Sequence, residues 1–197
     1  MTEPEIIAFV SSEEHLGIPF ILSALAAAIS ALDSRVILVG EASGEVRLFD
    51  RSGEPGYVLV DVPFRPSPLF GAVLTGSDLV FVAASCKLDY IDAAKNIVKE
   101  LLFLGVAPAK TAAVLVDPDG MLPAETLDGM KAYLETSLGI KMACGISLDV
   151  EDDRNSSPVS LDGVPARDIF QLAGHILAHT RREAAPAALD LPAEISL

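Results

Sequence analysis

The chain has 197 residues, of which 51% are hydrophobic and 21% charged, proportions that indicate a compact globular protein rather than a disordered one. Its formal net charge of −14 makes direct binding to nucleic acid or to an anionic membrane unfavourable. Its two cysteines, Cys86 and Cys144, are far apart in apolar surroundings and predict buried thiols rather than a metal site. Because residues 1–5 lack the basic segment of a signal peptide, we expect a cytoplasmic protein.

The N-terminal region has the layout of a phosphate-binding loop. Residues 5–11 predict a strand buried on both faces, and residues 18–32 predict an apolar helix buried on more than one side. Pro19 is compatible with this helix because it falls in the first turn, where no helical N–H bond is lost. Strand, tight loop and helix in this order are typical of a nucleotide loop. The candidate loop comprises Ser11, Ser12, Glu13, Glu14, His15, Leu16, Gly17, Ile18 and Pro19.

The chemistry of such a loop is missing from these residues. The motif normally reads G-x-x-x-x-G-K-[ST], in which backbone N–H groups and a lysine hold phosphates and a hydroxyl holds Mg²⁺. Gly17 is present, but Ile18 stands at the lysine position and Pro19 at the hydroxyl position. Glu13 and Glu14 would repel a triphosphate by several kcal/mol even at an effective dielectric constant of about 20. We therefore predict a degenerate loop with no catalytic residue, no metal ligand and no ATP or Mg²⁺ cofactor.

The rest of the chain alternates strands and helices. Strands are expected at residues 35–40, 57–62, 78–84, 111–116 and 141–147, and helices at residues 68–74, 88–104, 123–137 and 165–182. Residues 41–56 show no convincing period. The alternation predicts an α/β fold, a single-domain three-layer sandwich with a mostly parallel sheet, over residues 1–182. Residues 183–197 are expected to form a disordered tail.

The order of these motifs resembles the MinD/ParA family of deviant-Walker P-loop ATPases. The family opens with S-G-K-G-G-V-G-K-T-T, in which Ser11 and Ser12 match the start and Leu16-Gly17 the V-G step, while Glu13 replaces the lysine that reaches across a dimer. The family's D-x-P-P element resembles Asp61-Val62-Pro63. The resemblance implies a P-loop NTPase fold, with Asp61 in the place of an aspartate that supports Mg²⁺ through water. It also places Asp117 nearest to an adenine-contacting asparagine.

Other candidate groups have alternative explanations. Asp61 caps the loop after its strand, or it pairs with Glu41 as a residual acidic site for a cation. His175 and His179, at i and i+4 on the last helix, are spaced to hold a metal, but they also complement the dipole of the helix C-terminus and no third ligand is evident. His15 is expected to be a solvated loop residue.

Two functions from different classes follow. The first is a non-catalytic pseudo-ATPase that acts as a protein-interaction or positioning scaffold, as a homodimer or beside an active partner ATPase. Its contact surface would be apolar and formed by Leu16, Ile18, Pro19 and Phe20. The alternative is a nucleotide-binding ATPase or metal-dependent enzyme with a rebuilt site that uses Glu41 and Asp61. No membrane anchor is expected, because the C-terminal segment is acidic and interrupted by Pro186 and Pro192.

Overall fold

The strands form where apolar residues run without interruption. The computed structural model describes residues 3–11, 13, 16–31, 35–40, 45–49, 55–65, 68–87, 90–148 and 166–184. Its strands are β1 (Glu5–Ser11), β2 (Arg35–Gly40), β3 (Glu45–Phe49), β4 (Pro55–Pro63), β5 (Leu79–Ser85), β6 (Thr111–Asp117) and β7 (Lys141–Ser147). They make one seven-stranded sheet in the order β3-β2-β4-β1-β5-β6-β7. Every neighbouring pair is parallel except β2 and β3, which confirms the mostly parallel sheet.

Strand β3 corrects the expectation that residues 41–56 contain no regular element. Its residues pair antiparallel with β2, from Val36 opposite Phe49 to Gly40 opposite Glu45. It forms one edge of the sheet and includes Glu45 and Arg47. An edge strand in a hairpin needs no continuous apolar run, and this is why the apolar pattern did not reveal it.

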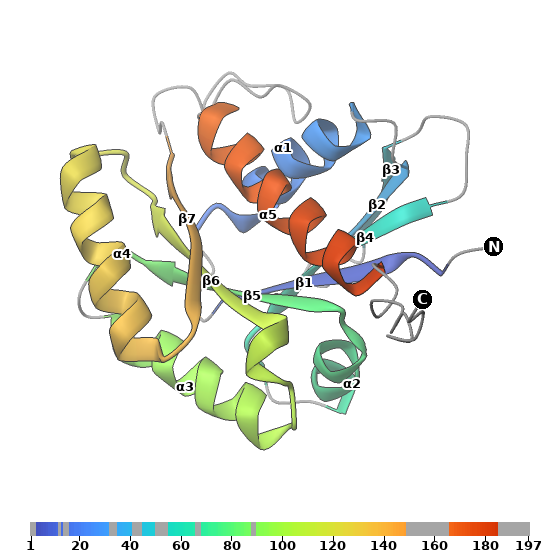
Figure 1. Ribbon diagram of the computed structural model, residues 1–197, viewed down its shortest axis with the longest axis horizontal. Coiled ribbons are helices and arrows are strands. Elements are labelled where there is room, and N and C mark those ends of the chain that lie inside the picture. Colours follow the sequence, from blue (N-terminus) through green and yellow to red (C-terminus); the bar gives the residue numbers. More distant parts are fainter. Residues whose placement is uncertain are drawn as a thin grey trace, which may run out of the picture.

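Helices cover both faces of the sheet (Figure 1). Helices α1 (Ile18–Ser30) and α5 (Ala166–Ala184) lie on one face, and α2 (Pro68–Gly76), α3 (Ile91–Phe103) and α4 (Ala124–Leu138) lie on the other. A short 3-10 helix, η2 (Pro108–Lys110), precedes β6. The predicted three-layer sandwich is therefore confirmed. No helix within the described residues combines the length and the apolarity needed to cross a membrane.

Each face of the sheet has its own hydrophobic core because side chains alternate along every strand. Phe9 and Phe81 point toward α1 and α5, where their rings stack with centroids 4.7 Å apart. Their neighbours Val10 and Val82 point toward the other three helices. Strands β5 and β6 are buried at every residue, so both cores meet at the middle of the sheet.

The second edge strand, β7, is covered by side chains from the neighbouring helices. The Met142 N–H donates to Glu135 Oε1 at 3.3 Å, and Gln171 Nε2 donates to the Ala143 carbonyl at 3.5 Å. The Lys131 side chain passes so close to Gly145 that a Cβ there would meet Lys131 Cε at 2.7 Å. Helices α4 and α5 thus provide hydrogen-bond partners for backbone groups of β7 that no strand pairs.

Helix α5 continues to Ala184, two residues past the expected end of the domain, and residues 185–197 lie outside the described part of the chain.

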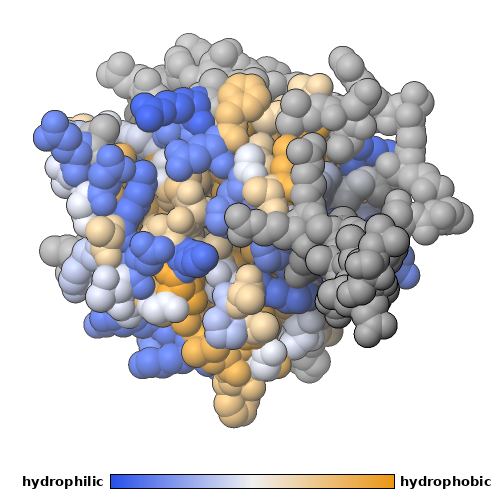
Figure 2. All heavy atoms as spheres, viewed as in Figure 1, coloured by the Kyte–Doolittle hydropathy of each residue, from blue (hydrophilic) through white to orange (hydrophobic). Residues whose placement is uncertain are grey.

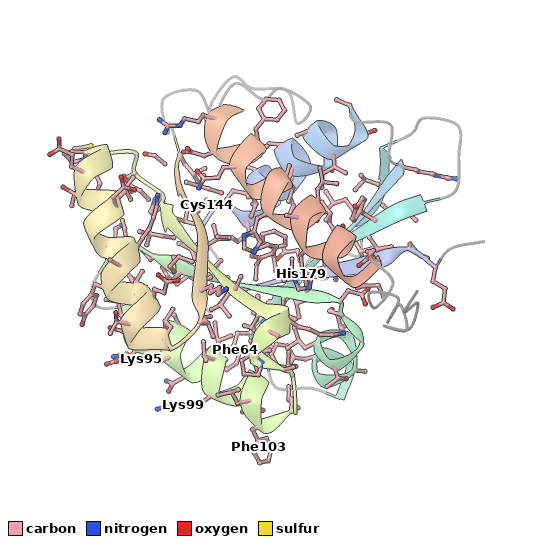
Figure 3. All side chains as sticks on the ribbon, in the orientation of Figure 1. Phe64, Lys95, Lys99, Phe103, Cys144 and His179 are labelled. Carbon is pink, nitrogen blue, oxygen red and sulfur yellow. The ribbon has the colours of Figure 1, made fainter. Side chains whose placement is uncertain are left out.

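The space-filling view shows polar side chains over α4 and an apolar side chain projecting at the bottom, where Phe103 ends α3 (Figures 2 and 3). Phe103 is 85% exposed.

Candidate functional site

The candidate loop lies at the carboxyl edge of the sheet. Strand β1 is central, and its last residue, Ser11, is in register with Pro63 of β4 and Ala83 of β5. The chain then turns into α1 at Gly17. Ligands of open α/β sheets bind at this edge. Of the predicted loop residues, Ser12, Glu14 and His15 lie outside the described residues.

Gly17 shapes the start of α1. Its backbone is left-handed, with φ 67° and ψ 20°, and its carbonyl accepts the N–H groups of Phe20 at 3.0 Å and Ile21 at 3.1 Å. The residue at this helix end is a glycine and supplies no side-chain cap. Helix N-termini bind anions through N–H groups left without an intrahelical partner, and Pro19 removes one of them. The start of α1 therefore offers an anion one backbone donor fewer.

The prediction that four residues form an exposed apolar contact surface is wrong for two of them. Leu16 and Ile18 are 1% and 4% exposed and belong to the core beneath α1 and α5. They turn inward because Ile18, Ile21, Leu22 and Leu25 share the buried side of the helix. Phe20, 46% exposed, and the exposed Pro19 remain on the surface.

Leu148 lies directly on the loop. A Cβ at Gly17 would collide with Leu148 Cδ1, so the leucine side chain occupies the space immediately over this glycine. The backbone of Leu148 is fixed, since its N–H donates to the Asp117 carbonyl at 2.9 Å and thereby continues the pairing of β7 with β6. An aliphatic side chain thus packs directly against the glycine at the start of α1.

Ser11 and Glu13, the described polar residues of the loop, are bonded to each other. Ser11 Oγ donates to the Glu13 carbonyl and accepts the Glu13 N–H, both at 3.0 Å. Partial burial raises the pKa of Glu13 above its usual value, and the positive charge of Lys87 offsets part of that rise. The Ser11 hydroxyl therefore holds the turn, and a carboxylate stands beside it.

Lys87, just after β5, is the cation that acts on Glu13. Its Nζ forms an ion pair with Asp119 Oδ2 at 2.9 Å, with both side chains about half exposed. Such surface pairs contribute little to stability. Lys87 is thus already paired with a carboxylate of the chain.

Asp117 joins the ends of three strands. It is 2% exposed, and its Oδ2 accepts the Leu122 N–H at 2.8 Å and faces Ser147 Oγ at 3.5 Å. Its Oδ1 accepts from the Cys86 thiol at 3.5 Å. The carboxylate therefore holds the turn after β6 and links β5 to β7. The resemblance placed Asp117 nearest to an adenine-contacting asparagine, and that placement stays a prediction.

Both cysteines are buried, as predicted. Burial and the negative charge of Asp117 raise the pKa of Cys86 to about 11. Burial and the negative charge of Asp168 raise the pKa of Cys144 to about 12. Thiols of this kind are almost entirely protonated near neutral pH and are poor nucleophiles.

Of the two residues of the predicted acidic site, the structure describes only Asp61. Asp61, partly buried on β4, is in register with Phe9 of β1 and Gly40 of β2. Glu41 follows Gly40 but lies outside the described residues, so its pairing with Asp61 stays a prediction. Within the described ranges, no group of three or more His, Cys, Asp or Glu side chains is arranged to hold a metal ion. His175 instead packs edge-on against the Phe81 ring, with centroids 5.8 Å apart.

Sequence reasoning missed Leu148 and Lys87. Both follow the last residues of strands, and the carboxyl ends of neighbouring parallel strands meet at one edge. An inspection of the residues immediately after each predicted strand would have found them. The sequence gives no sign of the contact between Leu148 and Gly17, because this contact depends on how far the pairing of β7 with β6 continues.

No protein-family model and no curated protein matches the chain. Solved structures match it. A chain of the MinC:MinD cell division protein complex from Aquifex aeolicus has a TM-score of 0.67 at 13% identity, over 88% of this chain and 96% of that one. A ParA family ATPase from Chlorobium tepidum TLS has a TM-score of 0.59 at 14% identity, over 88% and 100%.

A third structure, a putative plasmid partition protein from Borrelia burgdorferi B31 bound to AMPPNP, has a TM-score of 0.66 at 11% identity, over 90% of this chain and 99% of that one. Identities this low establish the fold alone. The chain has the MinD/ParA type of P-loop NTPase fold, as the motif order predicted.

Proposed function

We propose that this protein is a non-catalytic pseudo-ATPase with a MinD/ParA fold that acts as a protein-interaction or positioning scaffold. The observation that carries the proposal is the Leu148 side chain seated on Gly17. A side chain at this place, beside the start of α1, would hinder the approach of a triphosphate to the helix N-terminus. The proposal rests on this geometry together with the loop's composition.

The charges around the loop support the same conclusion. Ile18, at the position of the phosphate lysine, is buried in the core, and Pro19 offers neither an N–H nor a hydroxyl. Loss of one charge-assisted contact costs about 1.5–3 kcal/mol. Glu13 adds repulsion, and the nearby Lys87 is paired with Asp119. Bound ATP would have to displace Leu148 without gaining a lysine contact in return.

ATP and ADP with Mg²⁺ are therefore expected to leave the melting temperature unchanged. A ligand present at one hundred times its Kd would stabilise the fold by about 2.7 kcal/mol, an effect readily seen in a thermal-shift scan. The Borrelia protein, whose structure contains AMPPNP, serves as the positive control. Stabilisation by ATP that disappears in Asp61→Ala would overturn the proposal in favour of the enzyme with a rebuilt site at Glu41 and Asp61.

The carboxyl edge also exposes apolar side chains suited to a protein partner. Phe20 in the first turn of α1 is 46% exposed, Tyr90 at the start of α3 is 41% exposed, and Met121 after β6 is 80% exposed. All three follow strands that end at this edge. One of the matching structures is a complex of two proteins, MinC and MinD. We infer that this chain associates through its own carboxyl edge, as a homodimer that needs no nucleotide.

Sedimentation velocity at micromolar concentration is expected to give a dimer of the 20.7 kDa chain with or without ATP and Mg²⁺. The double variant Phe20→Ser/Met121→Ser should shift it to monomer, because both side chains are exposed in one chain and would lose an apolar contact. Phe103→Ser is the matched control, since Phe103 is exposed at the far end of α3. A monomer throughout, or equal effects of both variants, would contradict the homodimer.

A further inference from the structure

A groove of about 670 Å³ lies at the edge of the sheet opposite the candidate loop. It is bounded by the beginnings of β5, β6 and β7, by η2 and by the middle of α5. Figure 3 shows His179 on the side of α5 that faces these strand beginnings. The volume lies within the range of small-molecule sites. The groove shares no residue with the loop at Gly17.

The walls of the groove are aliphatic. Leu79, Ala112 and Ile140 are buried beneath it, and Ala178 and Pro108 stand at its exposed rim. No Phe or Tyr side chain of the described residues lines it. Such walls favour an aliphatic body over a flat aromatic ring, which is held by stacking on aromatic side chains.

Among the described residues, the ionisable groups that line the groove are all basic. They are Lys141 at the start of β7 and two of the three histidines of the chain, His175 and His179. No carboxylate of the described residues forms an ion pair with Lys141. In a chain with a net charge of −14, this convergence of basic groups is an exception. It gives one end of an otherwise apolar groove an affinity for an anion.

Two features limit the strength of that attraction. Helix α4 ends at the same rim, where Gly139 caps its carbonyl terminus and leaves a partial negative charge. The acidic chain as a whole also repels anions at long range. A carboxylate therefore gains from direct contact with Lys141 rather than from the general field, and we expect modest affinity.

We propose that this groove binds an aliphatic monocarboxylate of medium chain length, with its carboxylate at Lys141 and its chain over Leu79, Ala112 and Ile140. Octanoate is the probe. Titrated into the full 197-residue protein and followed by ¹H–¹⁵N NMR, it should shift the amides of residues 139–141 and 175–179 saturably. The expected Kd is on the order of 0.1–1 mM.

Variants of the groove distinguish this site from general hydrophobic binding. Lys141→Gln should weaken octanoate about tenfold, and Lys141→Arg should restore most of the affinity because the charge returns. Ala178→Phe should weaken it by filling the groove. Lys99→Gln, which removes an exposed lysine of α3 (Figure 3), should leave it unchanged.

The assignment is overturned if the amide shifts do not saturate, or if they spread away from the groove. It is also overturned if Lys141→Gln and Lys99→Gln have the same effect. Equal affinity for octanoate, 1-octanol and octylammonium would show an apolar groove with no preference for a carboxylate. None of these results depends on whether the loop at Gly17 binds ATP.

Discussion

Replacing Asp117 by alanine is expected to lower the free energy of unfolding by about 2–4 kcal/mol. The buried carboxylate accepts the Leu122 N–H at 2.8 Å and holds the Cys86 thiol and the Ser147 hydroxyl, each at 3.5 Å. Alanine would leave these donors without their partner in a partly buried site. Each buried donor left unsatisfied costs about 1–3 kcal/mol, and the short bond to Leu122 should account for most of the loss.

Two variants separate this role from a general effect of charge. Asp117→Asn keeps an acceptor oxygen of the same shape and should lose less stability than alanine. Asp119→Ala, two residues along, removes a half-exposed carboxylate that pairs with Lys87 and should cost less than about 1 kcal/mol. Urea denaturation followed by circular dichroism measures all three. If Asp117→Ala and Asp119→Ala lowered the free energy of unfolding equally, the hydrogen bonds of Asp117 would not be what holds the strand ends together.

Gly17→Ala is expected to destabilise the protein by about 2–3 kcal/mol. Part of this loss, about 1–2 kcal/mol, comes from holding a non-glycine residue in the left-handed region. The remainder comes from the new Cβ, which would push Leu148 Cδ1 out of its rotamer at a cost of about 0.5–1.5 kcal/mol. The measurement tests the contact on which the proposed function rests.

Gly139 supplies a matched control within the same chain. Its φ of 68° and ψ of 20° nearly equal the 67° and 20° of Gly17, but nothing lies within 4 Å of a Cβ built on it. Gly139→Ala should therefore show the backbone strain alone. In a Leu148→Ala background, the cost of Gly17→Ala should fall to that of Gly139→Ala. An unchanged cost in that background would mean that Leu148 does not rest on the loop.

The central strands could be predicted because they are buried on both faces. Strands β5 and β6, buried at every residue, appear in the sequence as unbroken apolar runs. Strand β3 could not be predicted in this way, because it lies at an edge and includes Glu45 and Arg47. Helix ends were predictable where glycine takes the left-handed cap, as Gly139 does after α4.

The candidate site was predictable in position but not in its packing. Strand, loop and helix order located the loop, and Ile18 and Pro19 showed which chemistry was missing. Apolarity alone did not reveal that Leu16 and Ile18 face the core while Phe20 faces solvent. The contact between Leu148 and Gly17 joins residues that are far apart in sequence, so it depends on the register between β6 and β7.

The covered edge of β7 restricts how other chains can recognise this fold. Bare strand edges invite β-augmentation, in which a peptide extends the sheet, and they also nucleate amyloid-like stacking. Glu135, Gln171 and Lys131 stand where such a peptide would have to run along β7. A peptide that extended the sheet along β7 would therefore have to displace these three side chains.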